Sequence, residues 1–219
     1  MPKVYPSDLH DDINKRIATN RDDYLNSWYQ FAAGWNAVAY RFLSCAESNS
    51  DFISSIIKYG NSPSPPERYN QEKLIFNFFV SGLSAIDSLC YALYSACSIL
   101  DRINFPISNK DDLRRVTIES TTKRLTKSTL QNKGGIVKSL KSLIESPEYK
   151  DWKEKRNILA HRSAPGRNAF VGGNEDGKVK WIGGLEIDKN TTARKYEWLS
   201  AKIKTLIEEI SPFVNHHFR

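Results

Sequence analysis

The sequence has few cysteines, and those it has are scattered. Cys45, Cys90 and Cys97 each lie among apolar residues with helical spacing, and no two of them form a C-x-x-C pair. Disulfide frameworks and zinc sites need cysteines, or cysteines and histidines, at short regular spacings. The sequence therefore predicts neither a disulfide framework nor a metal site, and it favours a reducing cytoplasm as the location of the protein.

The motifs of several enzyme classes are also missing. The chain has no H-E-x-x-H segment, no serine, histidine and acid set fixed by sequence context, and no internal repeat. The Gly-Gly pairs at 172–173 and 183–184 do not precede predicted helices and lack a lysine at P-loop spacing, which argues against a phosphate-binding loop. We therefore expect no cofactor and no bound metal.

Signals for export or membrane insertion are weak. The N-terminal residues MPKVYPSDLHDDINKR lack the apolar stretch of a signal peptide. The apolar segment 70–100 is long enough to span a membrane. However, Asp87 lies near its middle, where a charge costs roughly 2.5 to 3.5 kcal/mol on insertion scales. We interpret this segment as the core helix of a bundle and expect no contact with a membrane.

Helical periodicity dominates the rest of the chain. A length of 219 residues, 40% hydrophobic and 26% charged, is typical of one globular domain spanning residues 1–219. Apolar residues at spacings of three and four predict a long helix at about 21–46, with Asn20 as a candidate cap. Residues 1–19 have a weaker pattern, which indicates a short helix or an N-terminal arm. Further helical segments are expected at 51–59, 70–100, 111–129, 136–146 and from Thr191 or Thr192 to about His217. The expected fold class is an all-α bundle of five or six helices.

One segment departs from this pattern. In residues 168–187, Val179 and Trp181 alternate with lysines, and a turn signal lies at 174–177. Alternation of this kind next to a turn predicts a small β-hairpin insertion. Because the segment follows His161 closely, we expect the hairpin to border any cleft near that residue.

The positive charge of the chain is concentrated in one region. Residues 110–167 hold 15 Lys or Arg against 7 Asp or Glu, whereas the remaining residues hold 17 against 18. A local excess of this size is the electrostatic footprint expected of a surface that binds a polyanion, and nucleic acid in particular. A solvated, lysine-rich surface is the alternative interpretation, and the charge count alone does not decide between them.

Residues 146–166, SPEYKDWKEKRNILAHRSAPG, are the stretch that most suggests chemistry. Ser146 suits the N-cap of a helix and Pro147 its first position, and the Pro-Gly pair at 165–166 would end the helix. At 100° per residue, one face of this helix carries a stripe that should face the core. The stripe consists of Tyr149, Trp152, Leu159 and Ala160.

Arg156 falls within this stripe, and a buried arginine needs an acceptor or a cleft. His161 lies about 140° from Arg156 around an ideal helix, whereas Asn157 shares a face with His161. Two geometries would bring Arg156 and His161 to one atom. The last turn could open before Ser163, or two copies of the helix could face each other across a dimer axis.

Residues 156–161, Arg-Asn-Ile-Leu-Ala-His, resemble the motif of the HEPN superfamily, in which an arginine and a polar residue precede a histidine. The motif lies on a late helix of an otherwise helical and basic chain, as in that family. The resemblance covers most of residues 20–217. It implies an all-helical domain and a metal-independent endoribonuclease.

The resemblance also implies roles for single residues. His161 would act as general base on the ribose 2′-OH or as acid on the leaving oxygen, Arg156 would stabilise charge on the phosphate, and Asn157 would orient the substrate or His161. An imidazole that can accept or donate a proton, together with a guanidinium that binds phosphate oxygens, suits such chemistry. We expect RNA to contact the basic residues around the motif, which are Lys138, Lys141, Lys153, Lys155 and Arg162.

Members of this family often belong to toxin–antitoxin or other defence systems, so an antitoxin or regulatory protein is a further expected partner besides a second copy of the chain. A different interpretation of the same residues is a non-catalytic helical interaction module. In such a module Arg156 would be a satisfied interface arginine, and His161 would be favoured at a helix C-terminus by the dipole. Asp87 likewise has two interpretations, either as a residue that orients Arg156 or an interface group, or as a half-exposed polar residue.

Overall fold

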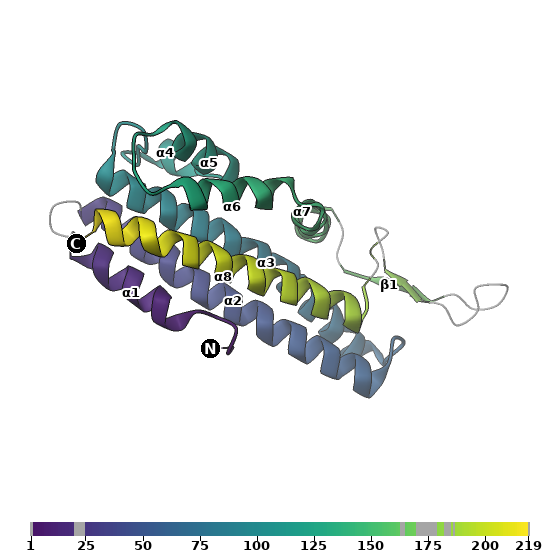
Figure 1. Ribbon diagram of the computed structural model, residues 1–219. Helices are drawn as coiled ribbons and strands as arrows, with labels where there is room; N and C mark the ends of the chain where they lie inside the picture. Colours follow the sequence, from purple (N-terminus) through teal and green to yellow (C-terminus); the bar gives the residue numbers. More distant parts are fainter. Residues whose placement is uncertain are drawn as a thin grey trace. The chain divides into compact units, whose positions relative to one another are not determined.

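The computed structural model describes residues 2–19, 25–162, 165–169, 179–181, 185 and 187–218 (Figure 1). In these residues the chain forms eight α-helices and one pair of short antiparallel strands. They are α1 (Ser7–Ala18), α2 (Leu25–Tyr59), α3 (Pro65–Leu100), α4 (Lys110–Arg114), α5 (Ile118–Lys127), α6 (Gly134–Glu145), α7 (Pro147–His161), β1 (Arg167–Ala169), β2 (Val179–Trp181) and α8 (Lys189–His217). The fold is all-α as predicted, but the expected count of five or six helices is wrong.

The extra helices are short ones whose starts are set by local capping. Asn109 caps α4 and Thr117 caps α5, each through a capping box in which side chain and backbone exchange hydrogen bonds. α4 has no buried residue, so no apolar stripe marks it in the sequence. α1 buries only His10, Ile13 and Ile17, which explains the weak pattern of residues 1–19.

The long helices differ from their predicted bounds. α2 continues without a break to Tyr59, which confirms the predicted helical extension over residues 51–59. α8 begins before the predicted threonines, because the carboxylate of Asp188 accepts a hydrogen bond from the backbone N–H of Thr191 at 2.6 Å. Asn20, the predicted cap of the first long helix, and the predicted turn at 174–177 lie outside the described residues.

The chain divides into two compact units. The first comprises Met1–Tyr40, Ser84–Ser146 and Ser200–Arg219, and the second comprises Arg41–Leu83 and Pro147–Leu199. The helices α2, α3 and α8 are each divided between the two units, with one part in the first unit and the other part in the second. The motif helix α7 and the strands therefore belong to the second unit, whereas α4, α5 and α6 belong to the first.

In the first unit, α1 is joined to α2 through one pair of side chains. Nε1 of Trp35 donates a hydrogen bond to the carbonyl oxygen of His10 at 2.9 Å, and Nε2 of His10 lies 3.1 Å from the carbonyl oxygen of Trp35. Their rings also stack, with centroids 4.7 Å apart. On another side of this unit α6 runs beside α8 (Figure 1), and a Cβ built on Gly135 would lie 1.8 Å from the carboxylate of Glu209.

In the second unit, Trp152 of α7 packs between aromatic residues of α3. Its indole N–H donates to the carbonyl oxygen of Phe79 at 3.0 Å, and its ring lies 5.1 Å from that of Phe78. Trp152 is 1% exposed, so this contact fixes α7 against α3. The strands β1 and β2 pair with Arg167 opposite Trp181, which confirms a short antiparallel pair, although β1 begins one residue before the predicted segment 168–187.

α3 is the one helix, within the described part of the chain, that is long and apolar enough to cross a membrane. Its most apolar 18-residue window has a mean hydropathy of 1.5, and 61% of that window is buried inside the protein. Such burial is compatible with the predicted role of α3 as the core helix of a soluble bundle. Asp87 is exposed at the surface of this helix.

Candidate functional site

The motif helix α7 begins at Pro147 as the sequence predicts and ends at His161. Three of the four residues predicted to face the core are buried, namely Tyr149, Trp152 and Leu159. Ala160 is exposed, so the prediction for this residue is wrong. Ala160 lies at the edge of the predicted stripe. Burial of its single methyl group gains too little free energy to determine how the helix is rotated against the core.

The proposed catalytic side chains differ in their exposure. Arg156 and Asn157 are half-buried, whereas His161 is exposed at the end of the helix. The backbone N–H of Arg162 donates to the carbonyl oxygen of Ile158 at 2.9 Å, so the α-helical pattern continues past His161. The last turn is therefore closed as far as residue 162, and Arg156 and His161 keep their separation of about 140° around the helix.

Of the five predicted RNA-binding residues, two lie in the first unit and three in the second. Lys138 and Lys141 are exposed on α6 and line an open hollow of about 530 Å³ together with Ser142, Glu145 and Ser146. Lys153 and Arg162 are also exposed. Lys155 is different, because its ammonium group is paired with the carboxylate of Asp151 one turn earlier in α7.

Asp151 holds two cations in the second unit. Its two carboxylate oxygens accept hydrogen bonds from Lys155 of α7 and Lys195 of α8. Partial burial by itself would raise the pKa of Asp151, but the hydrogen bonds from the two lysines outweigh this effect and leave the pKa below its usual value. The single carboxylate of Asp151 offsets only one of these two positive charges, so the three groups together keep a net positive charge.

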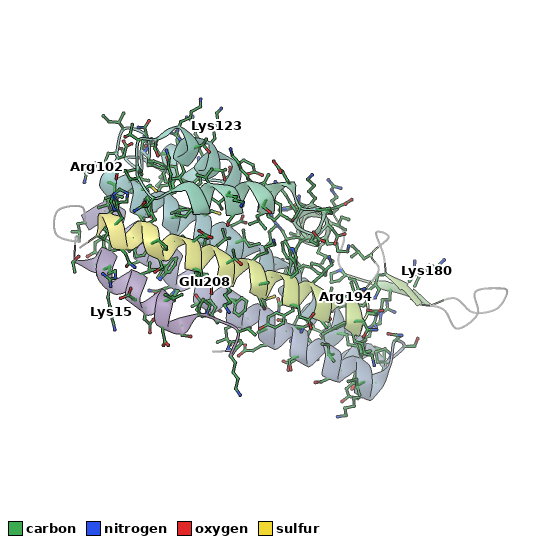
Figure 2. The ribbon with its side chains drawn as sticks, viewed as in Figure 1. Lys15, Arg102, Lys123, Lys180, Arg194 and Glu208 are labelled. Carbon is green, nitrogen blue, oxygen red and sulfur yellow. The ribbon has the colours of Figure 1, made fainter. Side chains whose placement is uncertain are left out.

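A basic face on α5 is not among the sites predicted from the sequence. Arg115, Lys123, Arg124 and Lys127 line a cavity of about 430 Å³ with Tyr94, Asn104 and Ser120. No acidic residue lines this cavity, and in the described part of the chain no ion pair involves Lys123, which Figure 2 labels, or Lys127. Residues 120, 123, 124 and 127 follow the helical spacing i, i+3, i+4, i+7, so the pattern is visible in the sequence. We call the four cations that line the cavity, Arg115, Lys123, Arg124 and Lys127, the α5 basic face; Arg115 lies at the end of α4, and the other three lie on α5.

Arg167 is a second residue that the sequence analysis missed. Its side chain is 3% exposed. The guanidinium donates to Oε1 of Gln71 at 2.7 Å and to the carbonyl oxygen of Asn61 at 3.0 Å, and it lies 4.8 Å from the ring centroid of Trp181. Burial lowers the pKa of Arg167, and Glu72 opposes this effect. These contacts join β1 to α3 and to the turn before it, which is a structural role.

A third feature is a cavity of about 370 Å³ in the second unit, between the first turns of α7 and those of α8. We call it the tryptophan cavity. Its lining residues are Glu148, Trp152, Thr191, Arg194, Lys195 and Trp198. It combines aromatic rings with charged groups of both signs, and none of the motif residues Arg156, Asn157 and His161 is among its lining residues.

The described residues contain no cluster of three or more histidine, cysteine, aspartate or glutamate side chains that could hold a metal ion. Cys45, Cys90 and Cys97 are buried thiols, and burial raises their pKa far above the usual range. These thiols are therefore protonated at neutral pH and are poor nucleophiles.

Comparison with known proteins identifies no relative of this chain. No protein-family model matches the chain, and neither a curated protein nor a solved structure matches it. The resemblance of residues 156–161 to the HEPN motif thus depends on those residues and on their place at the C-terminal end of α7.

Proposed function

We propose that this protein is a metal-independent endoribonuclease of HEPN type, active in the cytoplasm as a homodimer. The observation that carries the proposal is the end of α7, where an exposed histidine follows a half-buried arginine and asparagine within six residues. The anchoring of this helix through Trp152 supports it, because catalytic groups must be held in place by a rigid element.

In the proposed reaction the ribose 2′-OH attacks the adjacent phosphorus, and the bond from phosphorus to the 5′-oxygen of the next nucleotide breaks. His161 takes the proton of the 2′-OH while water protonates the leaving 5′-oxygen, or it protonates the 5′-oxygen while water accepts the proton of the 2′-OH. General acid–base catalysis of this kind accelerates a reaction about 10² to 10⁴ times. The guanidinium of Arg156 donates hydrogen bonds to the phosphate oxygens as negative charge builds on them. Asn157, on the same side of the helix as His161, orients the substrate or the imidazole.

Basic side chains at the surface bind the RNA chain. These cations all lie within the segment 110–167 that carries the positive excess: the α5 basic face, Lys138 and Lys141 on α6, Lys153 on α7, and Arg162 directly after α7. Contacts of this kind give affinity that depends on salt and not on sequence. Lys155 contributes less, because its ammonium group is already held in an ion pair with Asp151.

The closed last turn of α7 supports a dimer as the active form. In one chain Arg156 and His161 diverge by about 140°, and a two-fold axis near α7 would let Arg156 of one copy face His161 of the other. On the family resemblance, the partners of such a dimer include an antitoxin or regulatory protein of a defence system.

The deciding experiment is incubation of the full chain with single-stranded RNA in the presence of EDTA. The expected products carry a 2′,3′-cyclic phosphate or the 3′-phosphate formed from it, and DNA of the same sequence remains intact because it has no 2′-OH. His161→Ala should abolish cleavage, whereas His216→Ala, a histidine of α8 outside the motif, should not. Cleavage that requires a metal, or that survives His161→Ala, would refute the proposal.

The half-burial of Arg156 and Asn157 also favours a second candidate, a non-catalytic interaction module of the same fold. In that case the motif stabilises the interface between two copies. The cleavage assay separates the candidates, because an interaction module does not cleave RNA. For such a module, sedimentation analysis should still show that Arg156→Ala shifts the dimer toward monomers.

A further inference from the structure

The tryptophan cavity has the size and the lining of a small-molecule site. Its volume of about 370 Å³ lies within the range of roughly 300 to 1,000 Å³ that is typical of ligand pockets. Two helices far apart in sequence form it, with Glu148 and Trp152 from α7 and the other lining residues from the first turns of α8. The proposed ribonuclease mechanism uses none of these residues.

The aromatic part of the cavity is rigid on one side and accessible on the other. The rings of Trp152 and Trp198 are stacked, with centroids 6.0 Å apart and an interplanar angle of 30°. Trp152 is 1% exposed and hydrogen-bonded to α3, so it acts as a fixed support. Trp198 is half-buried, which leaves part of its indole available to stack on a planar ring.

The charged groups around the two tryptophan rings are of two kinds, those paired within the protein and those without an ion pair. Lys195 shares the carboxylate of Asp151 with Lys155 and lies 5.9 Å from the ring centroid of Trp152, so it belongs to the wall of the cavity and its position is fixed there. Glu148 and Arg194 are exposed, and neither forms an ion pair within the described part of the chain. Hydrogen bonds from Thr191 lower the pKa of Asp188, and Arg194 lies close enough to that carboxyl to add to this effect. The cavity therefore offers one carboxylate and one guanidinium that are both available to a ligand.

These groups match one class of ligand closely. A planar base can stack on Trp198, and base stacking on aromatic side chains is worth roughly 1 to 3 kcal/mol. A guanidinium binds a phosphate through two parallel hydrogen bonds, so Arg194 suits the phosphate. An ionised carboxylate only accepts hydrogen bonds, and guanine is the base that presents two adjacent N–H donors, at N1 and N2, to such a group.

We propose that the tryptophan cavity binds a guanine nucleotide, with its base between Trp198 and Glu148 and its phosphate on Arg194. The bound group is a free guanosine monophosphate or a guanosine residue of a single-stranded RNA, since both carry the same base and phosphate. Trp152 and His161 are nine residues apart on α7, which corresponds to about 13 Å along the helix axis. Binding here therefore does not depend on the proposed cleavage at His161.

The test is calorimetric titration of the full chain with GMP, UMP and guanosine, and with a short single-stranded RNA that contains one guanosine. GMP should bind at least about tenfold more tightly than UMP, and it should quench tryptophan fluorescence by stacking on Trp198. Binding of the RNA but not of GMP would assign the cavity to a residue of an RNA chain. Failure of both ligands to bind, or equal binding of GMP and UMP, would overturn the proposal.

Three substitutions separate the contacts. Trp198→Phe keeps a stacking ring, so GMP affinity should persist while much of the fluorescence response is lost. Arg194→Gln should weaken GMP at least tenfold and leave guanosine unchanged, because guanosine has no phosphate. Glu148→Gln should reduce the preference for GMP over UMP. Arg114→Gln, which removes an exposed charge on α4, is the matched control and should change none of these values. Unchanged GMP affinity in both Arg194→Gln and Glu148→Gln would exclude this site.

Discussion

Gly82 of α3 and Trp152 of α7 approach each other so closely that no side chain fits between them. A Cβ built on Gly82 would lie 2.3 Å from Cζ2 and 3.0 Å from Cε2 of the indole. Trp152 is fixed in this position by its hydrogen bond to Phe79 and by the rings of Phe78 and Phe79. The place of the motif helix in the second unit thus depends on a residue without a side chain on the facing helix.

The first prediction is that Gly82→Ala destabilises the protein. The added methyl group must displace a buried indole, and overpacking of this kind costs about 1 to 3 kcal/mol. The melting temperature should fall accordingly. Gly134→Ala is the matched control, because a Cβ at Gly134 meets nothing within 4 Å and alanine is the better helix former, so the melting temperature should stay the same or rise. Equal melting temperatures for wild type and Gly82→Ala would contradict the expectation.

The second prediction concerns the charge of Asp151. Its pKa is lowered in the folded protein, so it stabilises the fold above its ordinary pKa of 3.8, and this contribution is lost as the pH falls through the lower folded value. Asp151→Asn should therefore lower the melting temperature near neutral pH, and the difference from wild type should shrink as the solution is acidified below about pH 4.

The control for this substitution is Asp111→Asn. Asp111 has a side chain that is 74% exposed and lies 3.6 Å from Arg114, and an exposed pair of this kind is worth about 0 to 1 kcal/mol. Its melting temperature should follow that of wild type at each pH. A difference between wild type and Asp151→Asn that stays constant down to pH 3 would show that the charge of Asp151 does not stabilise the fold.

The third prediction is that the α5 basic face contributes to RNA affinity. Each phosphate contact to single-stranded RNA adds about 0.7 to the slope of log affinity against log salt. The double substitution Lys123→Gln and Lys127→Gln should therefore flatten the slope by up to about 1.4. The lysine pair Lys189 and Lys204 on α8 gives the matched control, since the same change of charge there should leave the slope unaltered.

The substitution of Lys138, Lys141 and Lys153 by glutamine is a companion measurement, because the sequence alone points to these lysines. It should also flatten the slope, whereas Lys155→Gln alone should have a small effect since Asp151 pairs with Lys155. A slope that neither set of substitutions changes would show that the basic excess of residues 110–167 is a solvated surface.

The sequence predicts best where an apolar period and a local signal agree. The spacing of Tyr149 and Trp152, together with Pro147 at the first position, predicts α7 with its correct start. The same logic fails for Ala160, because the edge of a stripe is decided by the neighbouring helices and not by the period. Short helices such as α4, which bury no residue, have a local cap as their main signal.

The parts of the site that could not be predicted are those formed by distant segments. Trp198 stacks on Trp152 although α8 and α7 are separated by the whole strand region, and no local pattern encodes this contact. The pairing of Asp151 with Lys195 is of the same kind. By contrast, the α5 basic face is a local feature with helical spacing, and it could have been found from the sequence once residues 118–127 were taken as one helix.

The last prediction is that two inactive variants restore each other's activity. In α7 the helix stays closed through residue 162, so Arg156 and His161 of one chain point in directions about 140° apart, and a dimer would combine Arg156 of one copy with His161 of the other. Arg156→Ala and His161→Ala should each be inactive when pure. If the subunits exchange freely, half of the dimers in an equimolar mixture are heterodimers, and each heterodimer has one of its two sites intact. The mixture should therefore regain about a quarter of the wild-type rate.

If Arg156 and His161 of the same chain formed the site, every heterodimer would lack one of the two residues in each site, and the mixture would remain inactive. Sedimentation analysis of both variants, with wild type as the reference, must show dimers for the comparison to hold, and a monomeric wild-type protein at micromolar concentration would itself contradict the prediction.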